Sequence, residues 1–313
     1  MAKSPIKIFS GSSHPELAKA IAKHMKVPLS EMLISKFACG EIYAKPKDTV
    51  RGADVFVIQT STGNVNEDLM ELFVMLDSLK RSFAGRIHVV LPHYPYSRQD
   101  RVATAREPIS AKLVADLIST AGADHVISLK LHSDQEQGFF NFPMDNLNTE
   151  RLFAKYFKKK KIKDLVVVSP DAGGAKDAKK FSDLLGAELA IIHKNRTGHN
   201  QSEVMHVVGN VKGKNCIIYD DMIDTAGSVT AAIKALKKMG ANKDIYLAAT
   251  HAVFSGPAED RLSEAGFKEV VVTDSIPVTA KFKGLKILSV APFLADIIQS
   301  VHADKSVTNV INK

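Results

Sequence analysis

An acidic pair followed by a run of small residues is the pattern in this chain that indicates most about chemistry. Asp220 and Asp221 follow the apolar run 216–219, and the segment 224–228, Asp-Thr-Ala-Gly-Ser, leads into a helical pattern. Backbone N–H groups at the start of a helix are available to bind a phosphate. Carboxylates at the carboxyl end of a strand can accept hydrogen bonds from sugar hydroxyls. The segment therefore predicts a site for a phosphorylated ribose.

A simpler interpretation is that the acidic pair begins a turn and that Asp224 or Thr225 caps the helix, as these residue types often do. However, the order of strand, acidic pair, small-residue turn and helix resembles the fingerprint loop of the phosphoribosyltransferase superfold, whose members bind phosphoribosyl diphosphate. This resemblance favours the sugar-phosphate site.

Other polar residues also follow expected strands. Arg98 and Gln99 come after an aromatic, proline-containing loop, where a guanidinium and an amide could meet a phosphate or a purine. Asp171 lies in a glycine-containing loop and could bind a cation or a hydroxyl. His132 ends an expected strand over 126–131 and could ligate a metal or contact a phosphate. A surface ion pair, a capping aspartate and a structural histidine are the simpler alternatives.

The polar segment 193–202 carries Lys194 and Arg196 between two apolar runs. A segment of this kind can form a lid over transferred phosphates, although a solvated hairpin tip would have a similar composition. The chain has no Walker-type loop, because the segment 209–215 has the wrong glycine spacing and lacks the Ser or Thr after lysine. No nucleophilic triad or zinc-type spacing is recognisable either.

Short apolar, β-rich runs alternate with amphipathic helical patterns along the chain, which predicts α/β architecture with mainly parallel sheets flanked by helices. Helices are expected over 67–81 and 110–121, where apolar residues keep helical spacing. The expected strands are Lys7–Phe9, Val55–Gln59, Ile87–Leu91, Val126–Leu131, Leu165–Ser169, Leu189–His193, Cys216–Tyr219, Ile245–Thr250, Val270–Thr273 and Ile287–Val290.

With 313 residues, the chain is long enough for two domains. The segment 138–148 interrupts the alternation, so we expect an N-terminal domain over 1–147 and a C-terminal domain over 148–313. The composition is 45% hydrophobic and 24% charged, with no apolar run long enough to span a bilayer and no signal-peptide pattern. These features predict a cytoplasmic enzyme without a membrane partner.

The chain has two cysteines, Cys39 and Cys216, which indicates neither a disulfide framework nor a metal cluster and fits a reducing compartment. The formal net charge of +8 could favour nucleic acid, but part of the excess is the lysine run 158–163 at an expected helix end. Anionic substrates explain the remainder, so no nucleic-acid partner is expected.

Taken together, the motifs resemble one family over almost the whole chain: the ribose-phosphate diphosphokinases, also called phosphoribosyl pyrophosphate synthetases. The segments that carry the resemblance are 94–100 (YPYSRQD), 108–112 (PISAK), 121–125 (AGADH), 169–176 (SPDAGGAK) and 220–225 (DDMIDT). The resemblance implies two phosphoribosyltransferase-like domains. It also implies transfer of the diphosphoryl group of ATP to the 1-hydroxyl of ribose 5-phosphate, with Mg²⁺.

The resemblance assigns a role to each candidate residue. The ribose 5-phosphate residues, all in the C-terminal domain, would be Asp220, Asp221, Asp224, Thr225, Ala226, Gly227, Ser228 and Thr230. The ATP residues, from the N-terminal domain, would be Phe37, Glu41, Arg98, Gln99 and His132. His132 and Asp171 would attend Mg²⁺, and Lys194 and Arg196 would act in catalysis as the mobile lid. A hexamer built from dimers is implied, with Arg51 and Arg106 at a regulatory anion site.

This chain departs from the family pattern in a few places. Cys39 stands where the family has a carboxylate or amide that contacts adenine, which puts ATP affinity or base selectivity in question. The phosphate loop has Ala226 and Ser228 where relatives often carry Cys or Gly and Thr, with little loss expected because backbone N–H groups bind the phosphate. The loop 101–106 and the tail 306–313 also differ, so regulation could differ.

Three alternatives remain at this point. A phosphoribosyltransferase would use the same phosphate loop but would not require ATP. A non-catalytic regulatory homologue is supported only by Cys39. An RNA-binding regulator is supported only by the positive net charge, and it would show a steep salt dependence of RNA affinity.

Overall fold

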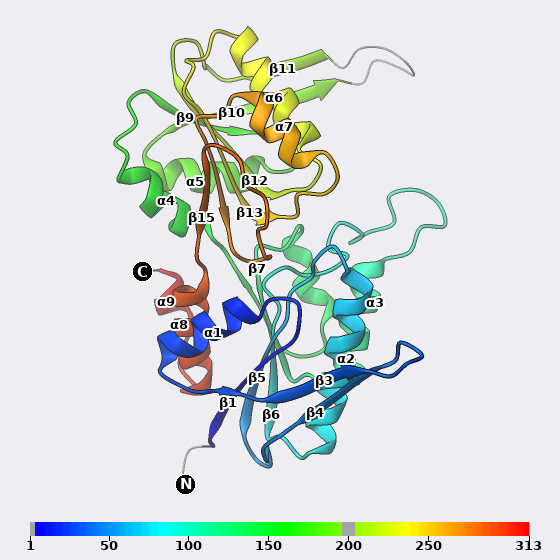
Figure 1. Cartoon of the computed structure of the whole chain (residues 1–313). Helices are drawn as coiled ribbons and strands as arrows, with labels where there is room; N and C mark the ends of the chain where they lie inside the picture. Colours follow the sequence, from blue (N-terminus) through cyan, green and yellow to red (C-terminus); the bar gives the residue numbers. More distant parts are fainter. Residues whose placement is uncertain (1–3, 196–203, 313) are drawn as a thin grey trace. The chain divides into compact units, whose positions relative to one another are not determined.

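The computed structural model describes residues 4–195 and 204–312, which form two compact units (Figure 1). Unit 1 comprises the chain up to Asn148 together with Ser275–Pro277 and the segment from Ser289 onward. Unit 2 comprises Thr149–Asp274 and Val278–Leu288. The predicted α/β class is confirmed, because each unit contains a mainly parallel sheet with helices packed on it.

Unit 1 is built on a six-stranded parallel sheet in the order β2-β1-β5-β6-β7-β8. Its strands are β1 (Ile6–Ser10), β2 (Leu29–Ser30), β5 (Asp54–Ile58), β6 (Arg86–Val90), β7 (His125–Leu129) and β8 (Met144–Leu147). The central strands β5 and β7 are buried along their whole length. This explains why they read as continuous apolar runs rather than as alternating ones.

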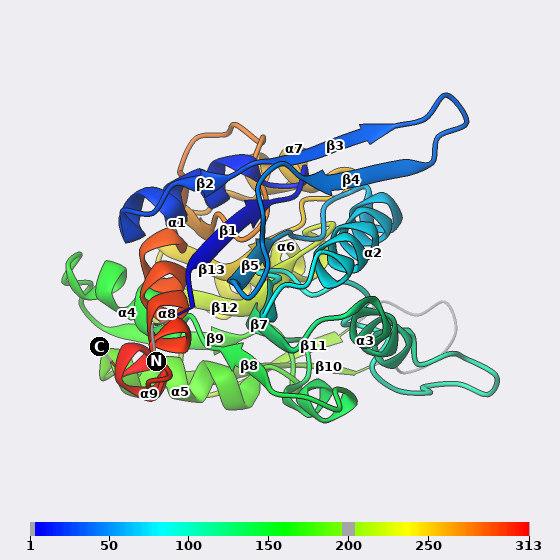
Figure 2. The same cartoon turned by 90° about the horizontal axis from the view of Figure 1, so that it is seen from below.

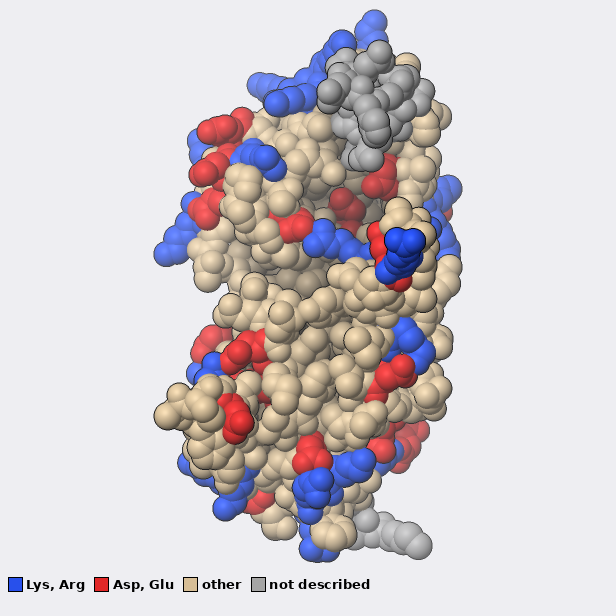
Figure 3. Space-filling view, turned by 90° about the vertical axis from the view of Figure 1, so that its right-hand side faces the viewer, with Lys and Arg blue, Asp and Glu red and all other residues tan. Residues whose placement is uncertain are grey.

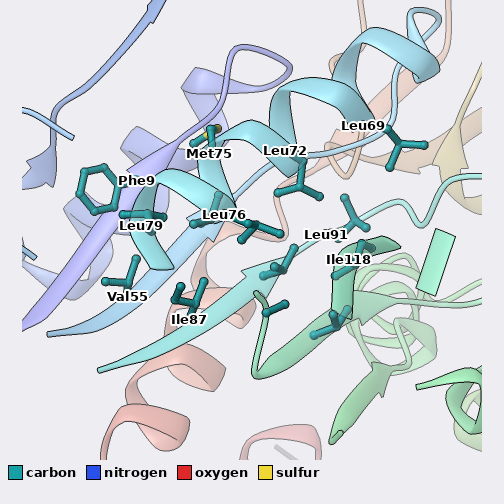
Figure 4. Packing of buried hydrophobic residues seen from close by; sticks show 14 of the residues in the cluster. Phe9, Val55, Leu69, Leu72, Met75, Leu76, Leu79, Ile87, Leu91 and Ile118 are labelled. Atoms are coloured by element: carbon teal, nitrogen blue, oxygen red, sulfur yellow. The ribbon is translucent and has the colours of Figure 1, made fainter. Parts of the chain in front are cut away.

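Helices α1 (Pro15–Met25) and α8 (Ala291–His302) lie on the opposite side of this sheet from α2 (Val65–Arg81) and α3 (Ser110–Ala121), as both ribbon views show (Figures 1 and 2). Figure 4 shows the apolar face of α2 packed over the strands. Its contacts come from one helical stripe, Leu69, Leu72, Met75, Leu76 and Leu79, and the last four of these are fully buried. The stripe predicted from helical spacing is therefore core.

A separate antiparallel hairpin of unit 1 consists of β3 (Met32–Lys36) and β4 (Ile42–Pro46). Figure 2 shows the hairpin extending past α2. An ion pair between Lys36 and Glu67 joins it to α2, and its turn places Phe37 in solvent with 56% of its surface exposed. An aromatic side chain this exposed is available for a ligand.

Unit 2 has a seven-stranded sheet in the order β11-β10-β9-β12-β13-β14-β15, parallel except for the β10–β11 pair. Its strands are β9 (Leu165–Ser169), β10 (Glu188–Asn195), β11 (Val204–Val208), β12 (Asn215–Ile223), β13 (Ile245–Ala252), β14 (Glu269–Thr273) and β15 (Leu285–Leu288). Its helices are α4 (Glu150–Lys158), α5 (Ala175–Leu185), α6 (Gly227–Lys238) and α7 (Ala258–Ala265).

Several elements differ from the sequence prediction. The apolar patterns do not predict β2, the β3–β4 hairpin, β8 or β11, and they place β15 two residues too late. The segment 138–148, expected to be irregular, contains the end of a 3₁₀ helix (Asp134–Phe139) and the strand β8. These strands are short or lie at sheet edges, where a two-residue alternation is weak.

The C-terminal segment differs from the expected domain division, in which it is part of the C-terminal domain over 148–313. Residues from Ser289 onward, including α8 and α9 (Thr308–Ile311), belong to unit 1. A buried carboxylate accounts for part of this. Asp54 on β5 accepts hydrogen bonds from Arg86 (2.9 and 3.0 Å), from His88 (2.9 Å) and from His302 of α8 (2.7 Å). Burial opposes the charged form, but these donors outweigh it and hold the pKa of Asp54 well below its usual range.

Changing Asp54 to Asn is expected to lower the free energy of unfolding by about 3 to 5 kcal/mol at neutral pH, because Arg86 and two histidines lose a buried carboxylate partner. The folded-state pKa lies below the unfolded one, so the unfolded chain takes up the proton first as the pH falls. The difference in the free energy of unfolding between the Asn variant and the wild type should therefore become smaller below about pH 4. Urea unfolding across this range measures it.

The surface pair of Asp77 and Arg81, whose side chains are 51% and 79% exposed, offers a matched control. Asp77→Asn should change the free energy of unfolding by less than about 1 kcal/mol at every pH. Equal effects of the two substitutions would contradict the role of Asp54 as the buried anchor of α8.

Among the described helices, none combines the length and the apolar character that a bilayer-spanning segment needs. On the face drawn in Figure 3, much of the surface is neither basic nor acidic, and lysine and arginine side chains lie in several separate groups, many of them beside aspartate or glutamate. On that face, the basic side chains do not form one continuous stripe.

Candidate active site

The acidic pair of unit 2 lies at the place where α/β sheets bind ligands. From β9 the chain moves outward to β10 and β11, whereas from β12 it moves in the other direction to β13, β14 and β15. Strands β9 and β12 are neighbours, so the crossover direction reverses between them. Ligands bind at the carboxyl ends of strands at such a switch point. Asp171 follows β9, and Asp220 and Asp221 lie near the end of β12.

The strand that carries the acidic pair is longer than predicted. β12 continues to Ile223 because β13 runs beside it as far as Ala252, with Asp220 opposite Ala249. The pair is therefore held by sheet hydrogen bonding rather than by a free turn. Burial is the main cause that raises the pKa of Asp220 well above its usual value, and the negative charges of Asp221 and Asp171 add to it. The site thus concentrates negative charge that a cation or hydroxyl donors would stabilise.

The start of α6 has the features of an anion site. Ala226, just before the helix, has a left-handed backbone with φ of 60° and is 4% exposed. This conformation is uncommon for a residue with a Cβ and recurs in backbone turns that bind anions. The N-cap residue of α6 is Ala226, and its side chain makes no capping hydrogen bond. Neither Asp224 nor Thr225, which the simpler interpretation made the cap, is therefore the N-cap residue.

The other residues predicted to hold the sugar phosphate surround this turn. Thr225 and Ser228 are exposed, whereas Asp224 and Gly227 are partly buried. The hydroxyl of Thr230 donates to the carbonyl oxygens of Ala226 (2.8 Å) and Gly227 (3.0 Å), so it ties the first turn of α6 together. Their ligand roles stay predictions.

Sequence reasoning missed Arg261 of α7. Its guanidinium Nη1 donates to the carbonyl oxygen of Thr225 (2.9 Å), and the same atom is 3.6 Å from the position that a Cβ on Gly227 would take. A fixed positive charge therefore lies beside the phosphate loop. No local motif marks it, because Arg261 lies 36 residues after the residue that it contacts.

The loop of Asp171 is tightly folded. Its carboxylate Oδ1 accepts a hydrogen bond from the N–H of Gly174 (3.0 Å), and a Cβ on Gly174 would lie 3.0 Å from the Ser169 hydroxyl. Within 4–195 and 204–312, no three His, Cys, Asp or Glu side chains lie close enough together to hold a metal ion. Mg²⁺ commonly uses only one or two carboxylates and completes its shell with water and substrate phosphates. Asp171 can supply one such carboxylate. His132, the other predicted ligand of Mg²⁺, belongs to unit 1.

Unit 1 has an equivalent switch point between β1 and β5, but its own side chains fill it. The Glu71 carboxylate accepts hydrogen bonds from the backbone N–H and the hydroxyl of Ser12, both at 2.6 Å, in the loop that leads to α1. The Gln59 amide contacts Ser13, and a Cβ on Gly11 would overlap that amide. An internal carboxylate thus occupies the place that an anion would take at the switch point of unit 1.

The predicted ATP residues of unit 1 come from two neighbouring loops and the hairpin. Arg98 and Gln99 are exposed in the loop between β6 and α3, where the Gln99 side chain accepts a hydrogen bond from the Ser110 hydroxyl (2.7 Å). His132 is exposed, but β7 ends at Leu129. The expected strand over 126–131 is therefore too long, because Lys130 has a left-handed backbone with φ of 37°.

A buried carboxylate beneath these loops was also missed. Glu136 is 0% exposed and accepts hydrogen bonds from the Ser97 hydroxyl (2.7 Å) and the Ser133 N–H (3.0 Å). Burial chiefly raises the pKa of Glu136 to about 7, with a contribution from Asp100, against the lowering effect of its hydrogen bonds and of His132. A glutamate in a polar stretch carries no sequence signal of burial.

The turn of the β3–β4 hairpin holds the predicted adenine contacts. Phe37 meets Tyr43 edge to face with ring centroids 5.9 Å apart, and Glu41 and Cys39 are exposed. Backbone hydrogen bonds between Phe37 and Glu41 (2.9 Å) and between Gly40 and Phe37 (2.8 Å) close the turn. Phe37 and Glu41 are thereby presented on one short, structured turn.

The structure gives less information on the residues predicted for the lid and for the regulatory anion site. Lys194 pairs through its backbone with Met205 in the β10–β11 ladder, and Arg196 lies outside the described residues. The Arg51 guanidinium stacks over the Phe83 ring at 4.3 Å, and Arg106 is exposed with φ of 73°. The structure therefore leaves the lid and the regulatory anion site as predictions.

Comparisons with known proteins point to the same family for both halves of the chain. The model of the N-terminal domain of ribose phosphate pyrophosphokinase matches residues 6–122, and that of the phosphoribosyl synthetase-associated domain matches 199–312. The ribose-phosphate pyrophosphokinase of Clostridium perfringens is 48% identical over 310 residues, covering 97% of each chain. That of Oceanobacillus iheyensis is 47% identical over 307 residues, covering 97% of this chain and 96% of its own.

Among solved structures, phosphoribosylpyrophosphate synthetase from Mycobacterium smegmatis superimposes with a TM-score of 0.91 at 46% identity. The match covers 96% of this chain and 100% of that one. The similarity thus includes both units, and no part of that structure lacks a counterpart.

Proposed function

The chain belongs to the ribose-phosphate pyrophosphokinase family, and on that premise we propose that unit 2 binds ribose 5-phosphate at the end of β12 while the loops of unit 1 bind ATP. The predicted family and activity are confirmed: the protein is an enzyme that transfers the diphosphoryl group of ATP to the 1-hydroxyl of ribose 5-phosphate. Full-length similarity to these enzymes favours this activity over a phosphoribosyltransferase and over a non-catalytic homologue.

The observation that carries the sugar site is the left-handed turn at Ala226, which starts α6 without a capping side chain of its own, next to the acidic pair at the switch point. The 5-phosphate would accept hydrogen bonds from the N–H groups of Gly227 and Ser228, where the helix dipole also favours negative charge. Asp220 and Asp221 would accept hydrogen bonds from the ribose hydroxyls. Arg261 would strengthen the local positive field beside the loop.

On the ATP side, we assign base stacking to the exposed ring of Phe37, with Glu41 beside it on the same hairpin turn. Arg98 and Gln99 would contact ATP from the β6–α3 loop, the guanidinium through charge-assisted hydrogen bonds to phosphate oxygens. His132 would contribute from the neighbouring loop after β7. All of these side chains are exposed and follow ordered elements of unit 1.

Mg²⁺ is the expected cofactor, with Asp171 and His132 as its predicted protein contacts. When bound, it would neutralise phosphate charge and orient the diphosphoryl group for transfer. Burial chiefly raises the pKa of Asp220, and the neighbouring carboxylates Asp221 and Asp171 add to it, so a cation bound at this edge would offset part of their mutual repulsion.

Diphosphoryl transfer requires the protein mainly to align the attacking hydroxyl and to stabilise developing negative charge. Anchoring ribose 5-phosphate by its phosphate and its hydroxyls orients the 1-hydroxyl. Lys194 and Arg196 would supply the positive charge over the transferred phosphates. We assign no dedicated general base to the described residues of the sugar site, because alignment and charge stabilisation are the main requirements of such a reaction.

Incubation of the purified protein with ATP, Mg²⁺ and ribose 5-phosphate, followed by chromatographic detection of AMP, tests this function. AMP and phosphoribosyl diphosphate should form in equal amounts, and only when all three components are present. No AMP formation across a range of phosphate and salt concentrations would overturn the proposal. Calorimetric titration of Mg²⁺ with and without ATP tests the cofactor separately, because substrate phosphates should tighten its binding.

Replacing Cys39 with Asp is expected to lower the KM for ATP by about threefold to tenfold, because a carboxylate accepts a hydrogen bond from an adenine amino group far better than a thiol does. The exposed turn should accommodate this change without loss of stability. Steady-state kinetics with ATP measures the effect, and Cys39→Ala serves as the control that removes the thiol without adding an acceptor. An identical KM in all three proteins would show that this position does not contact the base.

The assembly and location of the protein remain part of the proposal. We expect a hexamer built from dimers, with Arg51 and Arg106 contributing to a regulatory anion site, and a cytoplasmic location. Light scattering with and without inorganic phosphate tests the first expectation. The buried thiol of Cys216, whose pKa burial raises to about 11, would be unreactive in any compartment.

A further inference from the structure

Glu136 links two loops that carry proposed ATP residues. Its carboxylate Oε1 accepts hydrogen bonds from the Ser97 hydroxyl (2.7 Å) and from the backbone N–H of Ser133 (3.0 Å). The Ser97 oxygen in turn accepts a hydrogen bond from the backbone N–H of His132 (3.0 Å). One carboxyl thus connects the loop after β6 with the loop after β7 through a continuous chain of hydrogen bonds.

The members of this chain are buried, whereas the residues attached to them are exposed. Glu136 is 0% exposed and Ser97 is 5% exposed. Arg98 directly follows Ser97, and His132 directly precedes Ser133; both are exposed. The hydrogen bonds therefore hold the backbone at the points from which the proposed ligand side chains leave the protein core. A buried anchor under exposed side chains is the arrangement that keeps a binding site in one geometry.

Helix capping alone does not account for Glu136. As the third residue of a short 3₁₀ helix, it caps the N–H of Ser133, which is a common local arrangement. A cap of this kind needs neither complete burial nor a bond to Ser97, which lies 39 residues away. The second oxygen, Oε2, is also buried and has no hydrogen-bond partner among the described residues. An apolar side chain would fill the space without leaving that oxygen unpaired, so what the carboxyl contributes is the link between the loops.

We propose that Glu136 is a positioning residue for ATP, which through Ser97 holds the Arg98 and His132 loops in their binding geometry. The proposal rests on the proposed ATP role of those loops. Glu136 itself does not touch the substrate. Its removal should therefore weaken ATP binding while leaving the sugar site of unit 2 unchanged.

The central test compares Glu136→Leu with Glu136→Gln. We call the hydrogen-bonded link formed by Glu136, Ser97 and the backbone of His132 and Ser133 the clamp. Leucine removes both hydrogen bonds that Glu136 accepts in it, and we expect this change to raise the KM and the Kd for ATP by about tenfold. The KM for ribose 5-phosphate should stay within about twofold of wild type, since that substrate meets other residues. Glutamine keeps an accepting oxygen, so it should recover ATP affinity to within about twofold of wild type. Thermal unfolding confirms that each variant is folded at the assay temperature.

A double-mutant cycle tests the link through Ser97. Ser97→Ala should raise the Kd for ATP in the same direction as Glu136→Leu, and the double variant should bind ATP no more weakly than the weaker single variant. This follows because the two side chains belong to one chain of hydrogen bonds, which either substitution already interrupts. Additive losses would overturn the link.

Direct ATP binding by calorimetry, without ribose 5-phosphate, separates failure of the clamp from failure of the proposed function. If wild type binds ATP and Glu136→Leu binds it equally well, the clamp is wrong and the function stands. If Glu136→Leu raises the KM of both substrates alike, Glu136 has a general structural role and the clamp is again wrong. If wild type does not bind ATP, the proposed function fails and the clamp fails with it.

Discussion

Replacing Lys194 with alanine is expected to lower kcat by about three orders of magnitude, because one positive charge over the transferred phosphates is lost. The KM for ribose 5-phosphate should remain within about twofold of wild type, since that substrate is anchored by the α6 turn and the acidic pair. A loss seen in kcat and in kcat/KM alike is the signature of a contact made in the transition state. Initial rates of AMP formation at saturating substrates measure the effect.

A matched control is available on the same unit. Lys238, in the last turn of α6, is exposed, and Lys238→Ala makes the same change of side chain and charge away from the site. It should keep kcat within about twofold of wild type. If Lys194→Ala instead raised the KM for ribose 5-phosphate with kcat unchanged, Lys194 would bind the sugar phosphate in the ground state. The proposed lid would then be wrong.

Asp220→Ala is expected to raise the KM for ribose 5-phosphate by about 100-fold, because hydrogen bonds to a charged group contribute about 1.5 to 3 kcal/mol each. The KM for ATP should change little. The same substitution should raise the melting temperature, since burial and the charges of Asp221 and Asp171 raise the pKa of Asp220 and make its ionised form unfavourable in the free protein. A binding site that is destabilising without its ligand shows this combination.

Asp183→Ala on α5 is the control, because Asp183 is 61% exposed and pairs only with the exposed Lys179 among the described contacts. It should affect neither KM, and its effect on stability should be below about 1 kcal/mol. Calorimetric titration with ribose 5-phosphate alone checks the binding effect without turnover. Unchanged affinity for ribose 5-phosphate in Asp220→Ala, whatever the melting temperature, would show that the acidic pair does not bind the sugar.

Local patterns in the sequence predicted the parts of the fold that depend on neighbours along the chain. The apolar spacing predicted α3 at Ser110–Ala121 and β9 at Leu165–Ser169, where the structure has them. These signals are readable because helical and strand periodicities repeat within a few residues. The same applies to the turn before Gly227, whose composition predicted a helix start that could bind an anion.

Contacts between distant residues were not predictable in this way. β12 continues through Asp220 because β13 runs beside it, and the C-terminal helix returns to unit 1, where His302 contacts Asp54. Arg261 reaches the phosphate loop from a different helix, and Glu136 is buried beneath a loop 39 residues earlier.

The residue pattern alone is therefore enough to predict which residues could bind a phosphate, a sugar and a nucleotide, and on which local elements they stand. The extent of β12, the unit that holds the C-terminal helix and the buried groups that support the exposed ones are apparent only from the folded chain. Periodicity and capping depend on adjacent residues, whereas sheet pairing and burial depend on side chains that folding brings together from far along the chain.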